Sequence, residues 1–173
     1  MDVRISEILP EHRKLFLNLY NLYLYDLSAF TGEDPAEDGR FDTSNNDLYL
    51  ERKELFPYFI QCSGKVAGFA LVCAPPFVPD EIDYTIQELF LLKKYRGRQI
   101  AQTAVAEVMG RFSGRVRVEQ LKNNAAAVAF WRSFYKQHAI VYTETSESVE
   151  IEGLPGVHEM LAQTFTLSPN SLK

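Results

Sequence analysis

The stretch that decides the fold is ELFLLKKYRGRQIAQTAVAEVMGRF, residues 88–112, which passes from an apolar block through a basic turn into a helix-like pattern. Residues 84–92 are largely apolar and predict a strand. From Gly97 onward the apolar residues recur at helical spacing, so the strand is expected to lead directly into a helix. Four cations surround the glycine at this junction: Lys93, Lys94, Arg96 and Arg98.

Such a junction has the features of a phosphate-binding turn. The first N–H groups of a helix lack partners within the chain, and the peptide dipoles make that end attractive to anions. Gly97 allows close approach to the backbone, and Arg96 and Arg98 can donate charge-assisted hydrogen bonds to phosphate oxygens. The alternative is that these cations are simply solvated. No GxxxxGK[ST] or GxGxxG motif is present, which disfavours nucleotide hydrolysis and dinucleotide binding.

The rest of the chain alternates between strand and helix patterns. Strands are expected at residues 3–8, 55–62, 66–74, 84–92 and 114–121, with two closing strands within 139–149 and 157–167. Helices are expected from Pro10 to Gly32, after Gly97, and after an asparagine cap near residue 124, with a loop or short helix at 33–46. This order predicts an α/β (α+β) mixed sheet of six to seven strands with about four helices. The first helix is apolar over much of its circumference, so we expect it to be covered on two sides.

Length and composition narrow the class of protein. The 173 residues fit one domain, residues 1–173, and a net charge of −5 argues against nucleic-acid binding. The chain has no run of about eighteen apolar residues and no signal-peptide pattern, so we expect a cytoplasmic protein without membrane contact. Cys62 and Cys73 are expected to be buried free thiols, and neither they nor the three histidines suggest a metal site.

Two motifs together resemble a known family. YRGRQIA resembles the R/Q-x-x-G-x-G/A signature of the GNAT superfamily of N-acetyltransferases, with Arg96 first, Ala101 last, and Gln99 where the middle glycine is usual. Downstream, NNAAAVAFWRSFY resembles the N-x-x-A-x-x-hydrophobic-aromatic element of the same family. Its matching positions are Asn124, Ala127, Phe130 and Trp131. The chain is similar to uncharacterised bacterial members of this superfamily.

The resemblance implies a GNAT-like acyl-CoA N-acyltransferase fold and acetyl-CoA as cosubstrate, with no metal. The pyrophosphate is expected on the amides of residues 98–101, and the pantetheine arm beside the preceding strand. Pantetheine carries two amides and can pair with an exposed strand edge. The implied cofactor-binding residues are Phe90, Leu91, Leu92, Arg96, Gly97, Arg98, Gln99, Ile100, Ala101, Asn124, Ala127, Phe130 and Trp131.

Acetyl transfer to an amine requires a group that accepts a proton, because alkyl ammonium pKa values lie near about 10.4. Glu88 lies in the apolar strand, where desolvation raises a carboxyl pKa, and we expect it to be the general base. The alternative is that Glu88 faces solvent or pairs with a cation. Trp131 occupies the position where the family usually has the tyrosine that acts as general acid. Tyr135, one turn later, is therefore the candidate acid, with core packing as its alternative role.

The expected activity is transfer of an acetyl group from acetyl-CoA to a primary amine of a small molecule or peptide. Tyr23 and Asp26 on the first helix are candidate acceptor contacts, and a backbone N–H near Leu91 is the candidate oxyanion donor. For Asp26 the alternatives are a cap or a solvent-exposed carboxylate. Two other functions stay open: a non-catalytic acyl-CoA-binding or regulatory domain, and a protein that binds another phosphate ligand. A homodimer through the late strands also stays open.

Overall fold

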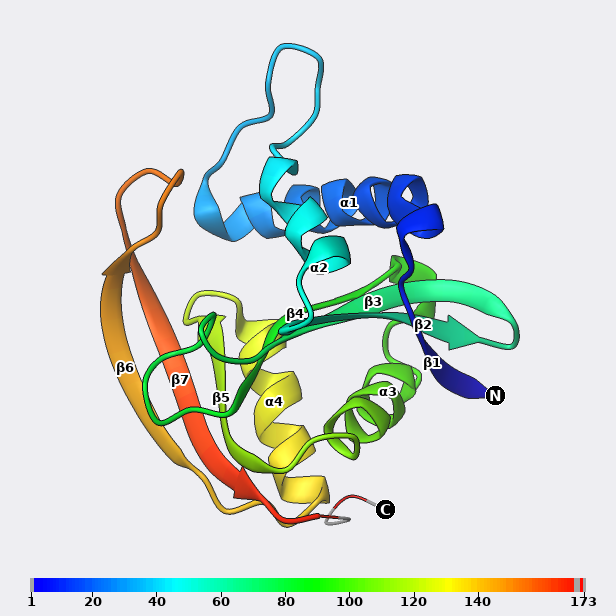
Figure 1. The fold of residues 1–173 in the computed structure, drawn as a ribbon. Helices are drawn as coiled ribbons and strands as arrows, with labels where there is room; N and C mark the ends of the chain where they lie inside the picture. Colours follow the sequence, from blue (N-terminus) through cyan, green and yellow to red (C-terminus); the bar gives the residue numbers. More distant parts are fainter. Residues whose placement is uncertain (1, 170–171, 173) are drawn as a thin grey trace.

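The structure, a computed structural model, describes residues 2–169 and 172 and contains one mixed sheet with helices on both faces (Figure 1). The strands are β1 (Val3–Glu7), β2 (Leu55–Cys62), β3 (Lys65–Cys73), β4 (Tyr84–Leu91), β5 (Gly114–Leu121), β6 (Thr143–Glu150) and β7 (Val157–Leu167). The α-helices are α1 (Arg13–Thr31), α2 (Leu48–Glu51), α3 (Ile100–Met109) and α4 (Ala125–Gln137). Short 3₁₀ turns occupy Pro10–His12, Ser44–Asp47 and Lys93–Tyr95. The predicted class is confirmed, with seven strands in the order β1-β2-β3-β4-β5-β7-β6.

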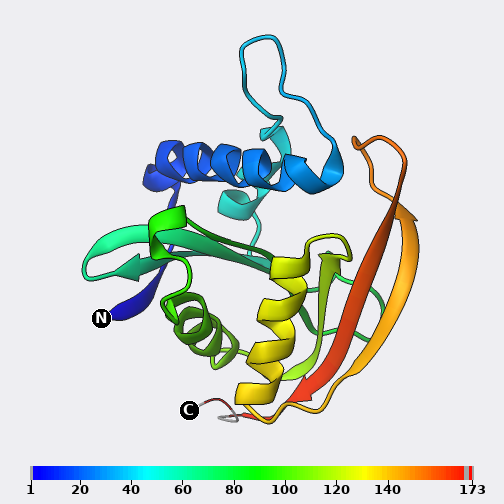
Figure 2. The same cartoon turned by 180° about the vertical axis from the view of Figure 1, so that it is seen from behind.

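Helix α1 covers one face of β2–β4 (Figures 1 and 2). It ends at the predicted Gly32, which adopts the left-handed conformation (φ 74°) and donates its N–H to Ser28 O. Phe16 is fully buried against Phe69. Leu15 and Leu22, however, are 42% and 48% exposed. The prediction that α1 is covered on two sides therefore holds only in part. The segment 41–50 contacts the helix besides the sheet, through Asn21–Phe41 and Arg13–Asp47, but the flank with Leu15 and Leu22 is uncovered.

Helices α3 and α4 lie on the opposite face, where they enclose the larger apolar core with β1 to β5 and β7 (Figure 2). Ile100, Val105 and Val108 of α3 and Phe134 of α4 are fully or almost fully buried there. Helix α4 begins at the expected cap, since Asn124 Oδ1 accepts the Ala127 N–H at 3.1 Å. The two helices thus place their amino-terminal ends beside the middle of the sheet.

Strand β4 is irregular in two ways that matter for function. Its register with β3 shifts between Leu71↔Glu88 and Val72↔Ile86, which leaves Gln87 as the extra residue of a β-bulge. Its parallel pairing with β5 is limited to Tyr84↔Val116 and Thr85↔Arg117. Beyond Thr85 the edge of β4 that faces β5 has no strand partner among the described residues, and the two strands separate.

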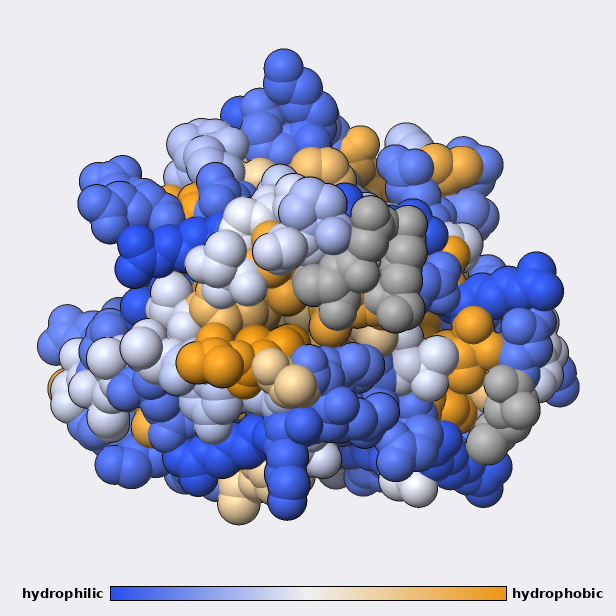
Figure 3. All heavy atoms as spheres, turned by 90° about the horizontal axis from the view of Figure 1, so that it is seen from below, coloured by the Kyte–Doolittle hydropathy of each residue, from blue (hydrophilic) through white to orange (hydrophobic). Residues whose placement is uncertain are grey.

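The carboxyl-terminal strands form a long hairpin at the far edge of the sheet. β7 pairs along its length with β5 and β6, and almost all of β6 is exposed. The expected strand within 139–149 begins only at Thr143, after a loop in which Ala139 has a positive φ of 51°. The face seen from below is mostly hydrophilic, with separate small apolar patches (Figure 3).

Three further predictions concern the cysteines, membrane-spanning helices and metal-binding residues. Cys62 and Cys73 are both buried free thiols, as predicted, and Cys62 lies opposite Lys65 in the β2–β3 pair. Within residues 2–169 and 172 no helix has the length and apolar character needed to cross a bilayer. The same residues contain no group of three or more His, Cys, Asp or Glu side chains placed to hold a metal ion.

A single glycine allows β3 to lie close to β4. A Cβ added to Gly68 would lie 1.9 Å from the backbone oxygen of Phe90, and this oxygen cannot move without displacing the strand. We expect Gly68→Ala to lower the free energy of unfolding by about 2 kcal/mol or more, measured by urea denaturation. Gly110→Ala is the control, because Gly110 has an ordinary φ of −63° at the end of α3. A Gly68→Ala protein as stable as this control would contradict the close approach.

Candidate active site

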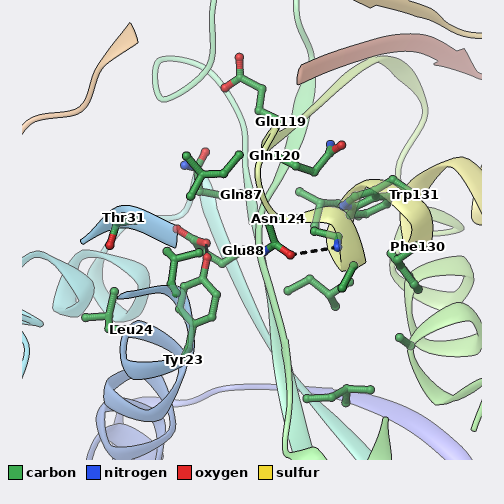
Figure 4. A pocket seen from close by; sticks show the side chains of 18 of the residues that line it. Tyr23, Leu24, Thr31, Gln87, Glu88, Glu119, Gln120, Asn124, Phe130 and Trp131 are labelled. Atoms are coloured by element: carbon green, nitrogen blue, oxygen red, sulfur yellow. Dashed lines mark hydrogen bonds between the residues drawn. The ribbon is translucent and has the colours of Figure 1, made fainter. Parts of the chain in front are cut away.

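A cavity of about 930 Å³ opens where β4 and β5 separate. Its walls come from α1, β4, the turn before α3, the ends of β5 and α4, and the loop between β6 and β7. In Figure 4, Tyr23 and Glu88 lie on the α1 side and Phe130 and Trp131 on the α4 side, with Asn124 between them. The cavity therefore lies between α1, where the sequence predicted acceptor contacts, and α4, where it predicted cofactor contacts.

The basic turn forms one end of this cavity. Gln99, Ile100, Ala101 and Gln102 donate no backbone hydrogen bond to any residue that the structure describes. These N–H groups belong to the first turn of α3, where an anion is favoured by both free donors and the helix dipole. Gln99 itself has a positive φ of 63°, a conformation that favours glycine. The turn therefore adopts the left-handed conformation with a glutamine at this position, and its N–H groups remain free.

The two arginines of the turn have different partners. Arg96 Nε donates to the backbone oxygen of Leu91 at 2.8 Å, and its terminal nitrogen donates to Asp26 of α1. The guanidinium also lies over the ring of Phe90, 5.6 Å from its centroid. Arg98 lines the cavity, is exposed, and has no ion pair with the described residues. Arg96 thus holds the turn in place, and Arg98 remains available to a ligand.

Glu88 lies in the cavity wall on the α1 face of β4. Tyr23 donates a short hydrogen bond to its carboxylate, and Tyr20 donates a longer one of 3.4 Å. Burial raises the pKa of Glu88 to about 7, although the two tyrosine hydroxyls act in the opposite direction. Near neutral pH the carboxylate is therefore able both to accept and to release a proton.

A known protein family matches most of the chain. The model described as Acetyltransferase (GNAT) family matches residues 18–134, more than half of the chain. The chain belongs to the GNAT acetyltransferase family. No curated protein matches the sequence.

Solved structures share the fold at low sequence identity. An acetyltransferase from Thermus thermophilus is 15% identical, with 96% of this chain and 98% of that chain covered and a TM-score of 0.65. A GNAT family acetyltransferase from Elizabethkingia anophelis, solved with acetyl-CoA bound, is 12% identical, with 95% and 98% covered and a TM-score of 0.56. A GNAT family acetyltransferase from Streptococcus pneumoniae is 16% identical, with 96% and 100% covered and a TM-score of 0.57.

Most of the residues expected to bind the cofactor in this GNAT protein line the cavity. They are Leu91, Arg96, Gly97, Arg98, Gln99, Ile100, Ala101, Asn124, Ala127, Phe130 and Trp131. Phe90 and Leu92 are outside the lining. Phe90 packs in the core beneath α1, and Leu92 packs against both cores. Any contact that these two residues make with the cofactor would therefore come from the backbone of the β4 edge.

Asp26 does not line the cavity. Its carboxylate pairs with Arg96 and lies 3.8 Å from Lys93 Nζ. We therefore replace the predicted acceptor contact with a structural role, in which Asp26 joins α1 to the basic turn. Tyr23, the other acceptor candidate, lines the cavity and contacts Glu88.

Tyr135 lies in the core behind Trp131 and is fully buried, so the predicted role as general acid is not retained. Its hydroxyl donates to Gln163 Oε1 at 3.4 Å and does not reach the cavity. Gln163 is itself held by reciprocal hydrogen bonds with Gln120. Tyr135 therefore belongs to a buried polar network that supports the α4 wall.

Some cavity residues had no signal in the sequence. The loop between β6 and β7 contributes residues 151–154, and Met160 of β7 lies nearby in the wall. Glu33 and Asp42, from the loop after α1, also line the cavity. These segments have little periodicity and no motif, and only the tertiary packing brings them near β4.

The environment of Glu88 makes its charge costly in the folded protein. Because the folded pKa is raised above the unfolded value, the cost is absent below about pH 4 and complete above about pH 7. We expect Glu88→Gln to raise the free energy of unfolding by about 1–3 kcal/mol at pH 8 and by much less at pH 4.5. Urea denaturation at both pH values measures this. Equal effects at the two pH values would contradict the raised pKa.

Proposed function

We propose that this GNAT protein transfers the acetyl group of acetyl-CoA to a primary amine of a small molecule or peptide, with Glu88 as general base. The observation that carries the proposal is the position of a carboxylate with a pKa of about 7 in the same cavity as the open first turn of α3. The acetyl-CoA complex of the Elizabethkingia anophelis protein supports the choice of cosubstrate by similarity of fold.

The turn before α3 has the donors that a diphosphate requires. Free N–H groups at Gln99, Ile100, Ala101 and Gln102 belong to one helix end, and Arg98 adds a positive charge there. The unpaired edge of β4 offers backbone groups to the amides of the pantetheine arm. The free N–H groups and the unpaired strand edge are thus the groups that the diphosphate and the pantetheine amides require.

The proton balance of the reaction follows from the groups in the cavity. Glu88 accepts a proton from the attacking amine, directly or through water, and Tyr20 and Tyr23 hold its carboxylate in position. The nitrogen forms a bond to the acetyl carbon, and the carbon–sulfur bond breaks. The departing thiolate has a pKa near about 8.5, so a proton from solvent is sufficient and no tyrosine acid is required. Trp131 is then a wall of the cavity and not a proton donor.

Glu88→Gln tests the base. We expect the rate of thiol release from acetyl-CoA with amines to fall by about 10²–10⁴-fold, while the Kd for CoA changes by less than about threefold. In the wild type, kcat/KM is expected to rise with pH through an apparent pKa near 7, separate from that of an acceptor amine above about pH 9. Glu107→Gln on the exposed side of α3 is the charge-matched control.

Two outcomes would contradict this assignment of roles. Retention of the neutral limb of the pH profile in Glu88→Gln would mean that another group accepts the proton. Tight CoA binding without turnover over a broad panel of amines would favour a non-catalytic acyl-CoA-binding domain.

Arg98→Ala tests the diphosphate site. Loss of one partly solvated charge-assisted contact is expected to weaken CoA binding by about 5–50-fold, measured by calorimetry at low salt. Lys94→Ala is the matched control, since Lys94 belongs to the same basic cluster but lies over the ring of Tyr95 and outside the cavity. Equal losses for the two variants would indicate a general charge effect and not a specific contact.

A further inference from the structure

The single tryptophan of the chain, Trp131, lines the cavity on its α4 side (Figure 4). The residue is only 5% exposed, and a buried indole N–H normally has an acceptor within the protein. The N–H of Trp131 donates to no residue that the structure describes. Trp131 therefore has a polar group that the packing of the protein does not satisfy.

This unused N–H is open to the cavity and is not enclosed by protein. Within the described part of the chain, the buried side-chain polar atoms that lack a partner are Gln102 Oε1 and His138 Nε2. The indole nitrogen is not among them, so it is accessible. Because little of Trp131 is exposed and the residue belongs to the cavity wall, the accessible nitrogen faces the cavity. A ligand in the cavity can therefore supply the missing acceptor.

Three aromatic neighbours on α4 hold the indole plane. Tyr135 stacks on it, with ring centroids 6.0 Å apart and planes inclined by 25°, and Phe130 and Phe134 meet it edge to face. The Tyr135 hydroxyl is held in turn by the buried Gln163. A ring packed in this way cannot turn toward another acceptor without displacing its neighbours. The N–H of Trp131 therefore keeps one direction.

The position of Trp131 determines which atom of the ligands it meets. The proposed cofactor turn at residues 97–101 lies on the same face of the sheet as α4, whereas Glu88 lies on the α1 side (Figure 4). The sulfur is the last atom of the CoA arm, so it reaches the acetyl carbon from the α4 side. The amine reaches the same carbon from the side of Glu88. The reacting atom closest to the wall that contains Trp131 is then the sulfur.

We infer that the indole N–H of Trp131 donates a hydrogen bond to the thioester sulfur and stabilises this atom as it becomes a thiolate. The inference rests on the proposed function, because it adds a catalytic residue to that same site. When the carbon–sulfur bond breaks, its electron pair remains on the sulfur, and solvent then protonates the thiolate. The indole keeps its own proton, since an indole is a hydrogen-bond donor only.

NMR tests this contact in the wild-type protein, because a single tryptophan gives a single indole N–H signal. The complex with CoA is compared with the complex with desulfo-CoA as the pH is raised through the ionisation of the bound thiol. The NMR shift of the CoA methylene bonded to sulfur follows that ionisation. We expect the indole proton to move downfield in step with it, because hydrogen bonds to a charged acceptor are shorter and stronger.

Desulfo-CoA is the control for other effects of pH, since the titratable groups of the protein are the same in both complexes. Its complex should show a much smaller change of the indole signal. Equal changes in the two complexes would overturn the inference. A response only to a non-reactive ketone analogue of acetyl-CoA, and not to CoA, would place the N–H on the carbonyl oxygen and would also overturn it.

An isosteric replacement tests the contribution to the rate. Benzothienylalanine keeps the shape of the indole and lacks the N–H, and a tryptophan-requiring strain incorporates it at position 131 alone. We expect kcat to fall by about 5–50-fold while the Kd for CoA changes by less than about threefold. Fluorotryptophan retains the N–H and is the matched control, with kcat within about threefold of the wild type. An unchanged kcat with benzothienylalanine, or an equal loss with fluorotryptophan, contradicts the inference.

The NMR comparison needs no turnover, so the inference and the proposed function can fail separately. A thiol-dependent indole shift in a protein that acetylates no amine would support the contact between Trp131 and the sulfur and refute the proposed function. Acetylation by a protein whose indole signal does not respond to the thiol would support the proposed function and refute the inference.

Discussion

The separation of β4 from β5 is the constraint on which the site depends. The two strands pair at Tyr84 and Thr85 and then part, so the backbone edge of β4 is exposed in the middle of the sheet. An unpaired edge inside a sheet exposes polar backbone groups that a ligand or water must satisfy. The bulge at Gln87 comes just after the last paired residue and changes the direction of the strand. A local disturbance of one strand thereby produces both the cavity and the position of Glu88.

The chemistry of Glu88 follows from its neighbours on α1. Without Tyr20 and Tyr23, a carboxylate in this apolar position would be strongly disfavoured in its charged form. With them, its pKa remains near neutrality and does not rise further. The last residue of the same helix, Thr31, also lines the cavity, so both the middle turns and the last turn of α1 form part of its wall. Two tyrosines of this helix, Tyr20 and Tyr23, thus hold the Glu88 carboxylate by hydrogen bonds.

The sequence was most informative where a local rule controls the structure. The boundaries of β5 and β7, the cap at Asn124, the stop at Gly32 and the open turn at residues 97–101 follow from periodicity, capping and glycine chemistry. The sequence was less informative where long-range packing determines the position of a side chain. Tyr135 and Trp131 lie on one helical face, but the register of β7 places Gln163 against Tyr135 and removes its hydroxyl from the cavity. The exposure of Leu15 and Leu22 has the same origin, because helix periodicity does not say how many neighbours a helix has.

The contact between Arg96 and Asp26 connects two parts of the protein that have different tasks. Arg96 fixes the turn at the diphosphate end through the Leu91 carbonyl, and Asp26 belongs to the helix that forms the opposite wall. If the two walls have the roles proposed above, a change in α1 that alters the choice of amine would also reach Arg96 and the turn before α3. A redesign of the helix would then have to keep a carboxylate at position 26 to preserve the affinity for CoA.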